Sequence, residues 1–305
     1  MALPDRCPLC AAGRETQSVV TPHVYGAARD GAAFFHCETC DVRYQYPGLT
    51  SDEESHFYAA EFEGFMAERA GHKGGWHKAE NHIAANELTR QRRMKYLAPH
   101  LKNGARLLEV GCSSGFMLFP LAEAGYECTG IEPSGVFSAF VESRGLAVYD
   151  SLSHLQQSVT DAKFDIILHF FVLEHIADPF AFLKAQLALL KPGGKIIFEI
   201  PNADDPLFSV YDIPAFERFY WSVAHPWYFS EPSLRHLLGQ LGQPYEMLLD
   251  QRYDLSNHMV WARDGKPGGM GRFANVFDAR FNESYKEALI RSGKCDTLIG
   301  IISKQ

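Results

Sequence analysis

A turn of small residues between two carboxylates carries the clearest chemical signal in this chain. Residues 107–115 form a short apolar run that contains Glu109 and ends in the turn, and Glu132 ends the next apolar run. Glycine in such a turn lets the backbone approach a ligand closely, because a side chain would block it. A carboxylate at the tip of the next strand can accept both hydroxyl hydrogens of a ribose. The layout therefore indicates a nucleoside-binding unit.

The spacing of the small residues decides between nucleotides. A dinucleotide fingerprint needs small residues at i, i+2 and i+5, and counting from Gly111 the last position falls on Phe116. A phosphate-binding loop needs a Lys–Ser/Thr pair after the turn, and none follows. Small residues recur instead at i, i+2 and i+4, as Gly111, Ser113 and Gly115. The pattern excludes both a dinucleotide fingerprint and a phosphate loop.

Composition limits the partners of the protein. The chain has 305 residues, 46% of them hydrophobic, and a net charge of −8, which suits a sizeable core and disfavours nucleic acid as a partner. We expect the one dense basic run, residues 90–95, to form the solvated face of a helix. The first residues lack an apolar targeting core, and no stretch is long enough to span a bilayer. We therefore expect a cytoplasmic protein without membrane insertion.

Four cysteines form a second chemical cluster. They make two CxxC pairs with 26 residues between them. Four thiolates can close a tetrahedral zinc site, which stabilises folding instead of activating water. The alternatives are disulfides, which a reducing compartment disfavours, and unligated thiols, which the pairing disfavours. We expect a structural Zn²⁺ on Cys7, Cys10, Cys37 and Cys40.

Alternating strand and helix patterns place these residues in an α/β fold. Residues 164–168 and 195–200 predict two further buried strands. The helix between them is capped by Asp178 and begins at Pro179, and residues 191–194 end it. In open sheets of this kind, ligands bind at the carboxyl ends of the strands. We expect residues 247–253 and 297–303 to close the sheet as an antiparallel hairpin.

These motifs resemble those of the class I S-adenosylmethionine-dependent methyltransferases over about residues 100–240. The resemblance includes the Leu-Glu-His sequence at residues 173–175 and Lys-Pro-Gly-Gly at residues 191–194. It implies a Rossmann-like seven-stranded sheet, mostly parallel with an antiparallel last strand. In that family the first acid lies near the methionine amino group of the cofactor, the second binds the ribose, and a third lies near the adenine. Ser113 departs from the family, which usually has glycine there.

The resemblance also implies a set of cofactor contacts. The expected residues are Glu109, Gly111, Ser113, Gly115, Glu132, Pro133, Asp150, His169, Phe170 and Phe171. As an acid in a loop, Asp150 is equally well explained by solvation alone.

An N-terminal two-knuckle module before such a domain resembles an arrangement in bacterial sugar C-methyltransferases and in relatives linked to polysaccharide or secondary metabolism. Those C-methyltransferases carry a large further domain after the core, and this chain ends soon after its own. We therefore expect a small-molecule acceptor that is methylated on a hydroxyl of a sugar, glycan or polar metabolite. The alternatives are sugar C-methylation and a cofactor-binding interaction or regulatory protein with weak or no transferase activity.

Methyl transfer to a hydroxyl needs a base. Glu174 and His175 follow a predicted strand, and His225 and Tyr228 lie in an aromatic loop after the next one. His225 is the best single candidate for the base, because an imidazole titrates near neutrality. His175 is as well explained as a packed histidine, and the aromatic loop suits a sugar ring or a plain hydrophobic cap.

The predicted parts are a zinc-binding module at residues 1–60, a helical linker or lid at residues 61–100, and the methyltransferase domain at residues 101–305 with an insertion around 254–292. Within the lid, Trp76, His77 and His82 could reach the cofactor. We expect a helix at about residues 275–291 in the insertion. The insertion itself could form a wall of the acceptor pocket or a homodimer contact.

Overall fold

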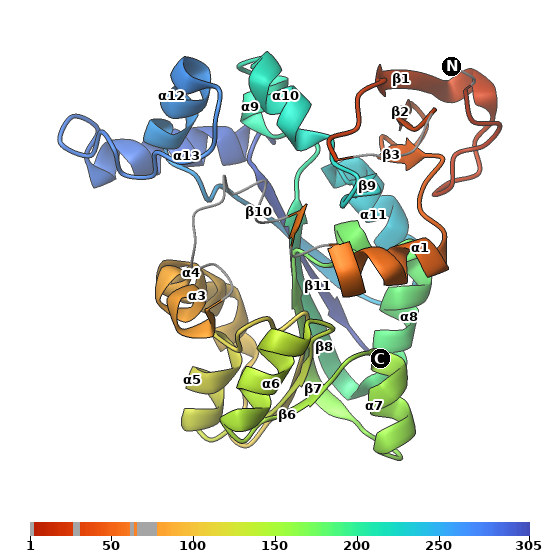
Figure 1. Cartoon of the computed structure of the whole chain (residues 1–305), viewed down its shortest axis with the longest axis vertical. Helices are drawn as coiled ribbons and strands as arrows, with labels where there is room; N and C mark the ends of the chain where they lie inside the picture. Colours follow the sequence, from red (N-terminus) through yellow and green to blue (C-terminus); the bar gives the residue numbers. More distant parts are fainter. Residues whose placement is uncertain (1–2, 27–30, 62–63, 66–77) are drawn as a thin grey trace.

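A seven-stranded sheet forms the centre of the protein (Figure 1). The structure is a computed structural model, and it describes residues 3–26, 31–61, 64–65 and 78–305. The order across the sheet is β10-β11-β8-β7-β4-β5-β6. Its strands are β4 (Arg106–Val110), β5 (Glu127–Ile131), β6 (Ala147–Tyr149), β7 (Phe164–Phe170), β8 (Leu190–Pro201), β10 (Tyr245–Asp250) and β11 (Thr297–Ser303).

The strand directions confirm the predicted Rossmann-like sheet. β4 to β8 pair with one another in parallel, whereas β11 is antiparallel to both β8 and β10. Two boundaries differ clearly from the prediction. Residues 191–194 form the beginning of β8 instead of a loop after the helix, and the strand predicted at residues 247–253 is β10, which ends at Asp250.

Helices cover both faces of the sheet, which explains why its strands are apolar on both sides. Within β7, Ile166 and Leu168 pack on one side with residues of α4 and α5, and Ile167 packs on the other with residues of α7, α8 and α11. Figure 1 shows these two groups of helices on opposite sides of the strands. The helices are α4 (Glu87–Leu97), α5 (Leu118–Glu123), α6 (Gly135–Ser143), α7 (Leu152–Ser158), α8 (Pro179–Leu189) and α11 (Glu231–Gln240).

Side-chain caps fix where two of these helices begin. Asp178 accepts a hydrogen bond from the Ala181 N–H at 2.9 Å, as predicted, and Pro179 begins α8. Ser230 and Ser233 form a capping box at the start of α11. A capped helix start holds the segment before it at a defined position. The candidate bases lie in the segments shortly before these two helices.

The N-terminal module shares its sheet with the rest of the chain. Its strands β1 (Gln17–Thr21), β2 (Ala33–Cys37) and β3 (Arg43–Tyr46) are antiparallel, and β9 (Trp227–Tyr228) pairs with β3 as the fourth strand. Ser230 also donates a hydrogen bond to the Asp41 carbonyl oxygen at 3.1 Å. The predicted boundary at residue 60 stays a prediction, but the sheet of the module extends to residues 227–228.

Further helices lie beyond the carboxyl edge of the sheet (Figure 1). The predicted helix of the insertion is α13 (Ala279–Arg291), and the sequence did not predict α12 (Leu255–Asp264), which Asp254 caps. Shorter elements are η1 (Arg14–Thr16), α1 (Ser51–His56), η2 (Phe57–Glu61), α3 (Ala79–Ala85), η3 (Ala98–His100), η4 (Leu173–His175), α9 (Pro206–Ser209) and α10 (Pro214–Tyr220). None of the helices in the described ranges is long and apolar enough to cross a membrane.

Candidate active site and metal centre

The turn after β4 depends on three left-handed residues. The φ angles are 74° at Gly111, 49° at Ser113 and 75° at Gly115. The i, i+2, i+4 spacing therefore marks the positions at which the backbone is left-handed. A Cβ on Gly111 would lie 2.7 Å from a methyl carbon of Val172, which a substitution could relieve only by moving that neighbour. Ser113 adopts a conformation that glycine adopts at less cost.

Glu132 is held by the same turn. Its carboxylate accepts hydrogen bonds from the Ser113 N–H at 2.7 Å and from the Ser134 N–H at 2.9 Å. The two bonds fix the carboxylate at the carboxyl end of β5. A carboxylate has about four acceptor positions, and a ribose presents two hydroxyl donors that such a group can bind.

Glu109 is the buried acid of the site. Its side chain is 2% exposed, and Oε2 has no hydrogen-bond partner among the described residues. Burial raises the pKa of Glu109 to about 8, and the nearby Arg93 opposes the shift. A buried carboxylate oxygen without a partner is costly. Together with Glu132, it fits a ligand that brings a cationic amine and a ribose, as S-adenosylmethionine does.

The other predicted cofactor residues occupy different environments. Pro133 is exposed, and the Asp150 side chain is 68% exposed and lies beside His154. Phe170 lies under the Arg93 guanidinium at 4.2 Å and Phe171 under that of Arg252 at 4.3 Å. These two rings line the carboxyl end of β7.

His169 departs from the predicted role. It is fully buried on the α8 side of β7, where its ring lies against Phe182 and stacks on Phe198 at 4.9 Å. Burial lowers the pKa of His169 to about 3. Side chains alternate between the two faces of a strand, so His169 points away from the face that carries Glu109 and Phe170. The structure favours a packing role.

The basic run of α4 was wrongly predicted as solvated. Arg92 and Arg93 each contact the buried Glu199 at 2.6 Å, and Arg92 also contacts Asp250 at 2.6 Å. Helical periodicity gave no sign of this, because the acids lie more than 100 residues away.

His82 does reach the turn after β4. Its Nδ1 lies 2.8 Å from the Ser114 hydroxyl, and its ring contacts Phe116 and Phe137. Burial lowers the pKa of His82. Ser114 itself is fully buried and was not singled out by the sequence. Trp76 and His77 lie outside the described residues.

Three of the four catalytic candidates come together. Glu174 and His175 lie in η4, His225 lies in the loop before β9, and one ligand atom from each lies within 4.8 Å of the others. The two imidazole rings are 4.6 Å apart. Burial raises the pKa of Glu174 to about 8. The cluster can accept a proton or bind a cation.

Tyr228 does not join this cluster through its hydroxyl. The side chain is 1% exposed, its hydroxyl donates to the Tyr220 carbonyl oxygen, and it accepts from the Ser222 N–H at 3.1 Å. Both bonds lie inside the protein. Tyr228 therefore stabilises the loop of His225, and its predicted catalytic role stays a prediction.

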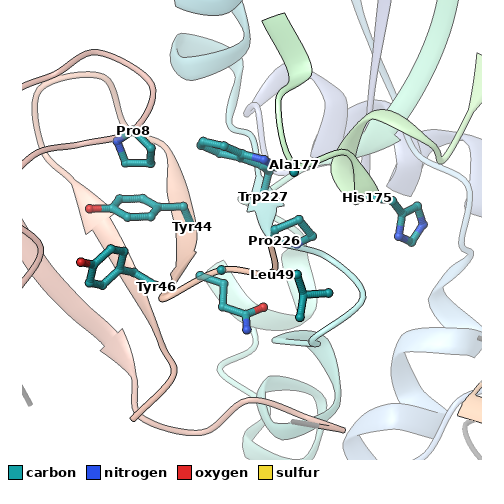
Figure 2. A pocket seen from close by; sticks show the side chains of 10 residues that line it. Pro8, Tyr44, Tyr46, Leu49, His175, Ala177, Pro226 and Trp227 are labelled. Carbon is teal, nitrogen blue, oxygen red and sulfur yellow. The ribbon is translucent and has the colours of Figure 1, made fainter. Parts of the chain in front are cut away.

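A cavity of about 180 Å³ lies between the N-terminal module and His175 (Figure 2). Typical small-molecule sites have volumes of roughly 300–1,000 Å³, so this cavity is too small to be the whole acceptor site. The lining residues are Pro8, Tyr44, Gln45, Tyr46, Gly48, Leu49, His175, Ala177, Pro226 and Trp227.

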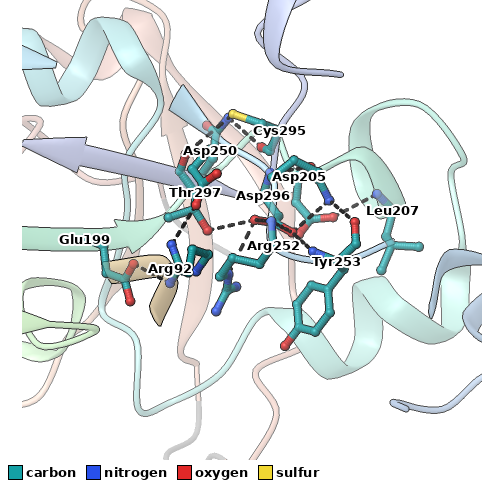
Figure 3. Close-up of polar contacts among 12 residues, drawn as sticks. Arg92, Glu199, Asp205, Leu207, Asp250, Arg252, Tyr253, Cys295, Asp296 and Thr297 are labelled. Atoms are coloured by element: carbon teal, nitrogen blue, oxygen red, sulfur yellow. Dashed lines mark hydrogen bonds and ion pairs between the residues drawn. The ribbon is translucent and has the colours of Figure 1, made fainter. Parts of the chain in front are cut away.

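A network of hydrogen bonds and ion pairs joins Asp296 to residues 251–253 (Figure 3). Asp296 accepts hydrogen bonds from the backbone N–H groups of Arg252 and Tyr253, both at 3.0 Å, and from the Gln251 side chain at 2.8 Å. The same carboxylate lies 3.4 Å from the Arg252 guanidinium, which covers Phe171. The network anchors the chain between β10 and the insertion.

The four cysteines of the module converge as predicted. Cys7 lies 3.7 Å from Cys40 and Cys10 lies 3.6 Å from Cys37, sulfur to sulfur. Ligands about 2.3 Å from a tetrahedral Zn²⁺ lie about 3.8 Å apart, so the group is compatible with zinc. Ala11 and Asp41, directly after the two pairs, both have positive φ angles, which turn the chain around the sulfurs.

Comparison with known proteins agrees with this geometry. A family model described as a methyltransferase domain matches residues 76–243, more than half of the chain. A ubiquinone biosynthesis O-methyltransferase of Cereibacter sphaeroides is 33% identical over 137 residues, which cover 43% of this chain and 56% of that protein. One of Dinoroseobacter shibae is 29% identical over 175 residues, 53% of this chain and 71% of that protein. The chain thus matches little more than half the length of the first of these relatives.

Solved structures share the fold. A SAM-dependent methyltransferase from Archaeoglobus fulgidus aligns with a TM-score of 0.51 and 18% identity, covering 80% of this chain and all of that one. Phosphoethanolamine N-methyltransferase 2 from Haemonchus contortus, in complex with S-adenosyl-L-methionine, gives a TM-score of 0.51 at 14% identity, covering 86% and 62%. At these identities the likeness shows the fold alone. The sheet, the turn after β4 and the matching family model together show that the chain belongs to the methyltransferase domain family.

Proposed function

We propose that this protein transfers the methyl group of S-adenosylmethionine to a hydroxyl oxygen of a small polar acceptor such as a sugar, a glycan or another metabolite. The observation that carries the proposal is the pair of acids at the carboxyl edge. Glu109 has a buried oxygen without a partner among the described residues, and Glu132 is fixed by two backbone N–H groups. Neither arrangement is needed for packing alone.

The two acids would hold opposite ends of the cofactor. Glu109 would receive the ammonium group of the methionine part, which supplies the hydrogen-bond donor that Oε2 lacks. Glu132 would accept the ribose hydroxyl groups. The left-handed turn at Gly111 and Gly115 leaves room for the ligand beside the backbone.

The acceptor oxygen would lie near Glu174, His175 and His225. In the transfer, the oxygen attacks the methyl carbon in line, the carbon–sulfur bond breaks, and sulfur keeps the electron pair as S-adenosylhomocysteine forms. The hydroxyl proton passes to this cluster, with His225 as the base. The similar proteins of Cereibacter sphaeroides and Dinoroseobacter shibae are O-methyltransferases, which favours oxygen over carbon as the acceptor atom.

The first test concerns the cofactor. Glu132→Ala should weaken S-adenosylhomocysteine binding by about 1 to 3 kcal/mol, the scale of charge-assisted hydrogen bonds, as measured by calorimetric titration. Glu127→Ala removes an exposed acid from the other end of β5 and should bind normally. Equal affinities in the two variants would place the ribose elsewhere.

The second test concerns the acceptor. Nucleotide sugars, glycans and small phenols should include a substrate whose methylated product is detected by mass spectrometry. His225→Gln should lose turnover of that substrate by about a hundredfold, in the range of general base catalysis, while cofactor affinity stays normal. His154→Gln, on the exposed surface, serves as the control. No product from any hydroxyl compound would refute the proposal.

A further inference from the structure

The cluster of Glu174, His175 and His225 has the composition of a metal site. Each residue offers one ligand atom, and all three atoms lie within 4.8 Å of one another. Nitrogen and oxygen ligands lie about 2.1 Å from a bound ion, so two of them are at most about 4.2 Å apart. Movements of less than about 1 Å would therefore close these three atoms around one cation.

The tautomer of His175 suits a ligand. Its Nδ1 lies 2.5 Å from the Ala224 carbonyl oxygen. A carbonyl oxygen can only accept a hydrogen bond, so Nδ1 carries a proton, and a cation would bind at Nε2. Histidines that bind metals usually donate their second nitrogen in this way, which fixes the ring and raises its basicity.

The position of His225 is fixed as well. Its backbone N–H donates to the Ser222 carbonyl oxygen at 3.0 Å. Ala224, which holds His175, is the residue directly before it. One short backbone segment therefore positions both imidazoles, and it is anchored by the internal hydrogen bonds of Tyr228.

Glu174 supplies an independent observation. Its side chain is 1% exposed, and both carboxylate oxygens lack a hydrogen-bond partner among the described residues. Arg93 and Arg252, whose charges act on Glu174, form ion pairs with Glu199 and Asp296 instead. A buried carboxyl group with no partner on either oxygen is unfavourable, and a cation between it and the two imidazoles would satisfy it.

We infer that Glu174, His175 and His225 bind a divalent cation, separate from the thiolate zinc site, and that this cation takes the acceptor hydroxyl as a further ligand. Two imidazoles and one carboxylate suit Mn²⁺, Fe²⁺ or Zn²⁺. Three protein ligands leave coordination positions open, as catalytic sites do.

The cation would deepen the proposed function by defining the acceptor. A metal ion lowers the pKa of a bound hydroxyl group, so the proton leaves to water and the resulting oxyanion attacks the methyl carbon. His225 would then give its lone pair to the cation instead of to the proton. Open positions favour an acceptor with two adjacent hydroxyl groups, such as a vicinal diol or catechol, because both oxygens can bind. Only this role of the cation rests on the proposed function; its binding does not.

Manganese binding tests the site directly. The full chain, with its thiolate site loaded with zinc, is titrated with Mn²⁺, and free Mn²⁺ is followed by electron paramagnetic resonance. One Mn²⁺ should bind per chain. Glu174→Gln and His225→Gln should each weaken binding at least tenfold, whereas His154→Gln should not change it. S-adenosylhomocysteine affinity reports whether each variant is folded, and His225→Gln decides the question alone if Glu174→Gln does not fold.

Three results would separate this inference from the proposed function. No Mn²⁺ or Zn²⁺ binding beyond the thiolate site, or equal binding in all variants, would overturn the inference. Turnover that survives removal of the second cation, with the thiolate zinc retained, would overturn its catalytic role and leave the proposed function standing. Binding that depends on Glu174 and His225, in a protein that methylates no hydroxyl compound, would uphold the site and refute the proposed function.

Discussion

The acids Glu109 and Asp150 both belong to the predicted cofactor set, yet they differ in what they can do. Glu109 lies within a central strand under Arg93, and burial raises its pKa to about 8. Asp150 is mostly exposed at the end of the edge strand β6. Only the buried acid must change its protonation when a cationic ligand arrives, so only Glu109 should link cofactor binding to pH.

Cofactor affinity should rise with pH in the wild-type protein. Glu109 is protonated in the free protein below about pH 8, and an ammonium group favours the ionised form, so binding releases a proton. Between pH 6 and 8 the affinity for S-adenosylhomocysteine should rise by up to about tenfold per pH unit. Calorimetry in buffers of different ionisation enthalpy measures both affinity and proton release.

The matched variant removes the titrating group. Glu109→Gln should bind more weakly and with little dependence on pH over the same range, whereas Glu127→Gln should keep the wild-type slope. A wild-type affinity that is flat from pH 6 to 8 would mean that the ammonium group does not meet Glu109.

Some of the site residues could be predicted from the sequence and others could not. The spacing of Gly111, Ser113 and Gly115 predicted the turn, because left-handed backbone favours small residues at fixed positions. The contact between His82 and Ser114 depends on how α3 packs against the turn, and the burial of His169 depends on which face of β7 it occupies. Local patterns do not encode such placements.

At the scale of elements, α4 is held by buried ion pairs as well as by apolar contacts. Arg92 and Arg93 both reach Glu199 on β8, and Arg92 also reaches Asp250 on β10. Two adjacent cations share one buried carboxylate, so the helix is joined to two strands at once. This arrangement also places Arg93 near Glu109 and over Phe170.

Removing one partner of this network should be costly. Arg93→Met keeps much of the apolar stem but leaves Glu199 with Arg92 alone, and we expect a loss of about 3 kcal/mol in the free energy of unfolding. Arg106→Met breaks a more exposed pair with Glu127 and should lose less than about 1 kcal/mol. Urea denaturation compares the two. Similar losses would show that the buried network contributes little more than a surface pair.

The sequence predicted the order of helices and strands along the chain better than it predicted which of them pair in space. The strands of the main sheet and the start of α8 have local signals, namely apolar runs and caps. α12 escaped prediction because its buried face includes polar residues, among them Ser256, Asn257 and His258. The pairing of β9 with β3 was not predicted either, since a two-residue strand has no recognisable sequence pattern.

At the scale of the whole molecule, the cysteine module packs directly against the segment of the candidate active site. Tyr44 of β3 pairs with Trp227 of β9, two residues after His225, and both belong to the main hydrophobic cluster. The Trp227 indole also donates to the Ile176 carbonyl oxygen at 2.9 Å, next to His175. The order of the cysteine cluster should therefore influence the loop that carries the candidate base.

Removal of zinc should also destabilise the segment that follows His225. After chelation, or in Cys10→Ser, hydrogen exchange should accelerate in β1 to β3 and also at residues 227–230, while β4 to β8 stay protected. Zinc sites of this kind supply folding energy to their modules. Restoring zinc to the chelated protein should restore protection in both places. Faster exchange confined to residues 3–46 would show that the two parts are independent.

The shared strand also sets where this chain can be divided. A cut near residue 47 would remove β3 and leave the backbone groups of Trp227 and Tyr228 unpaired at an open edge, and unpaired edges invite association between chains. The module on its own would likewise expose β3 along one side. A chimera that replaces this module would therefore have to replace two separate segments together, the cysteine region and the strand that follows His225.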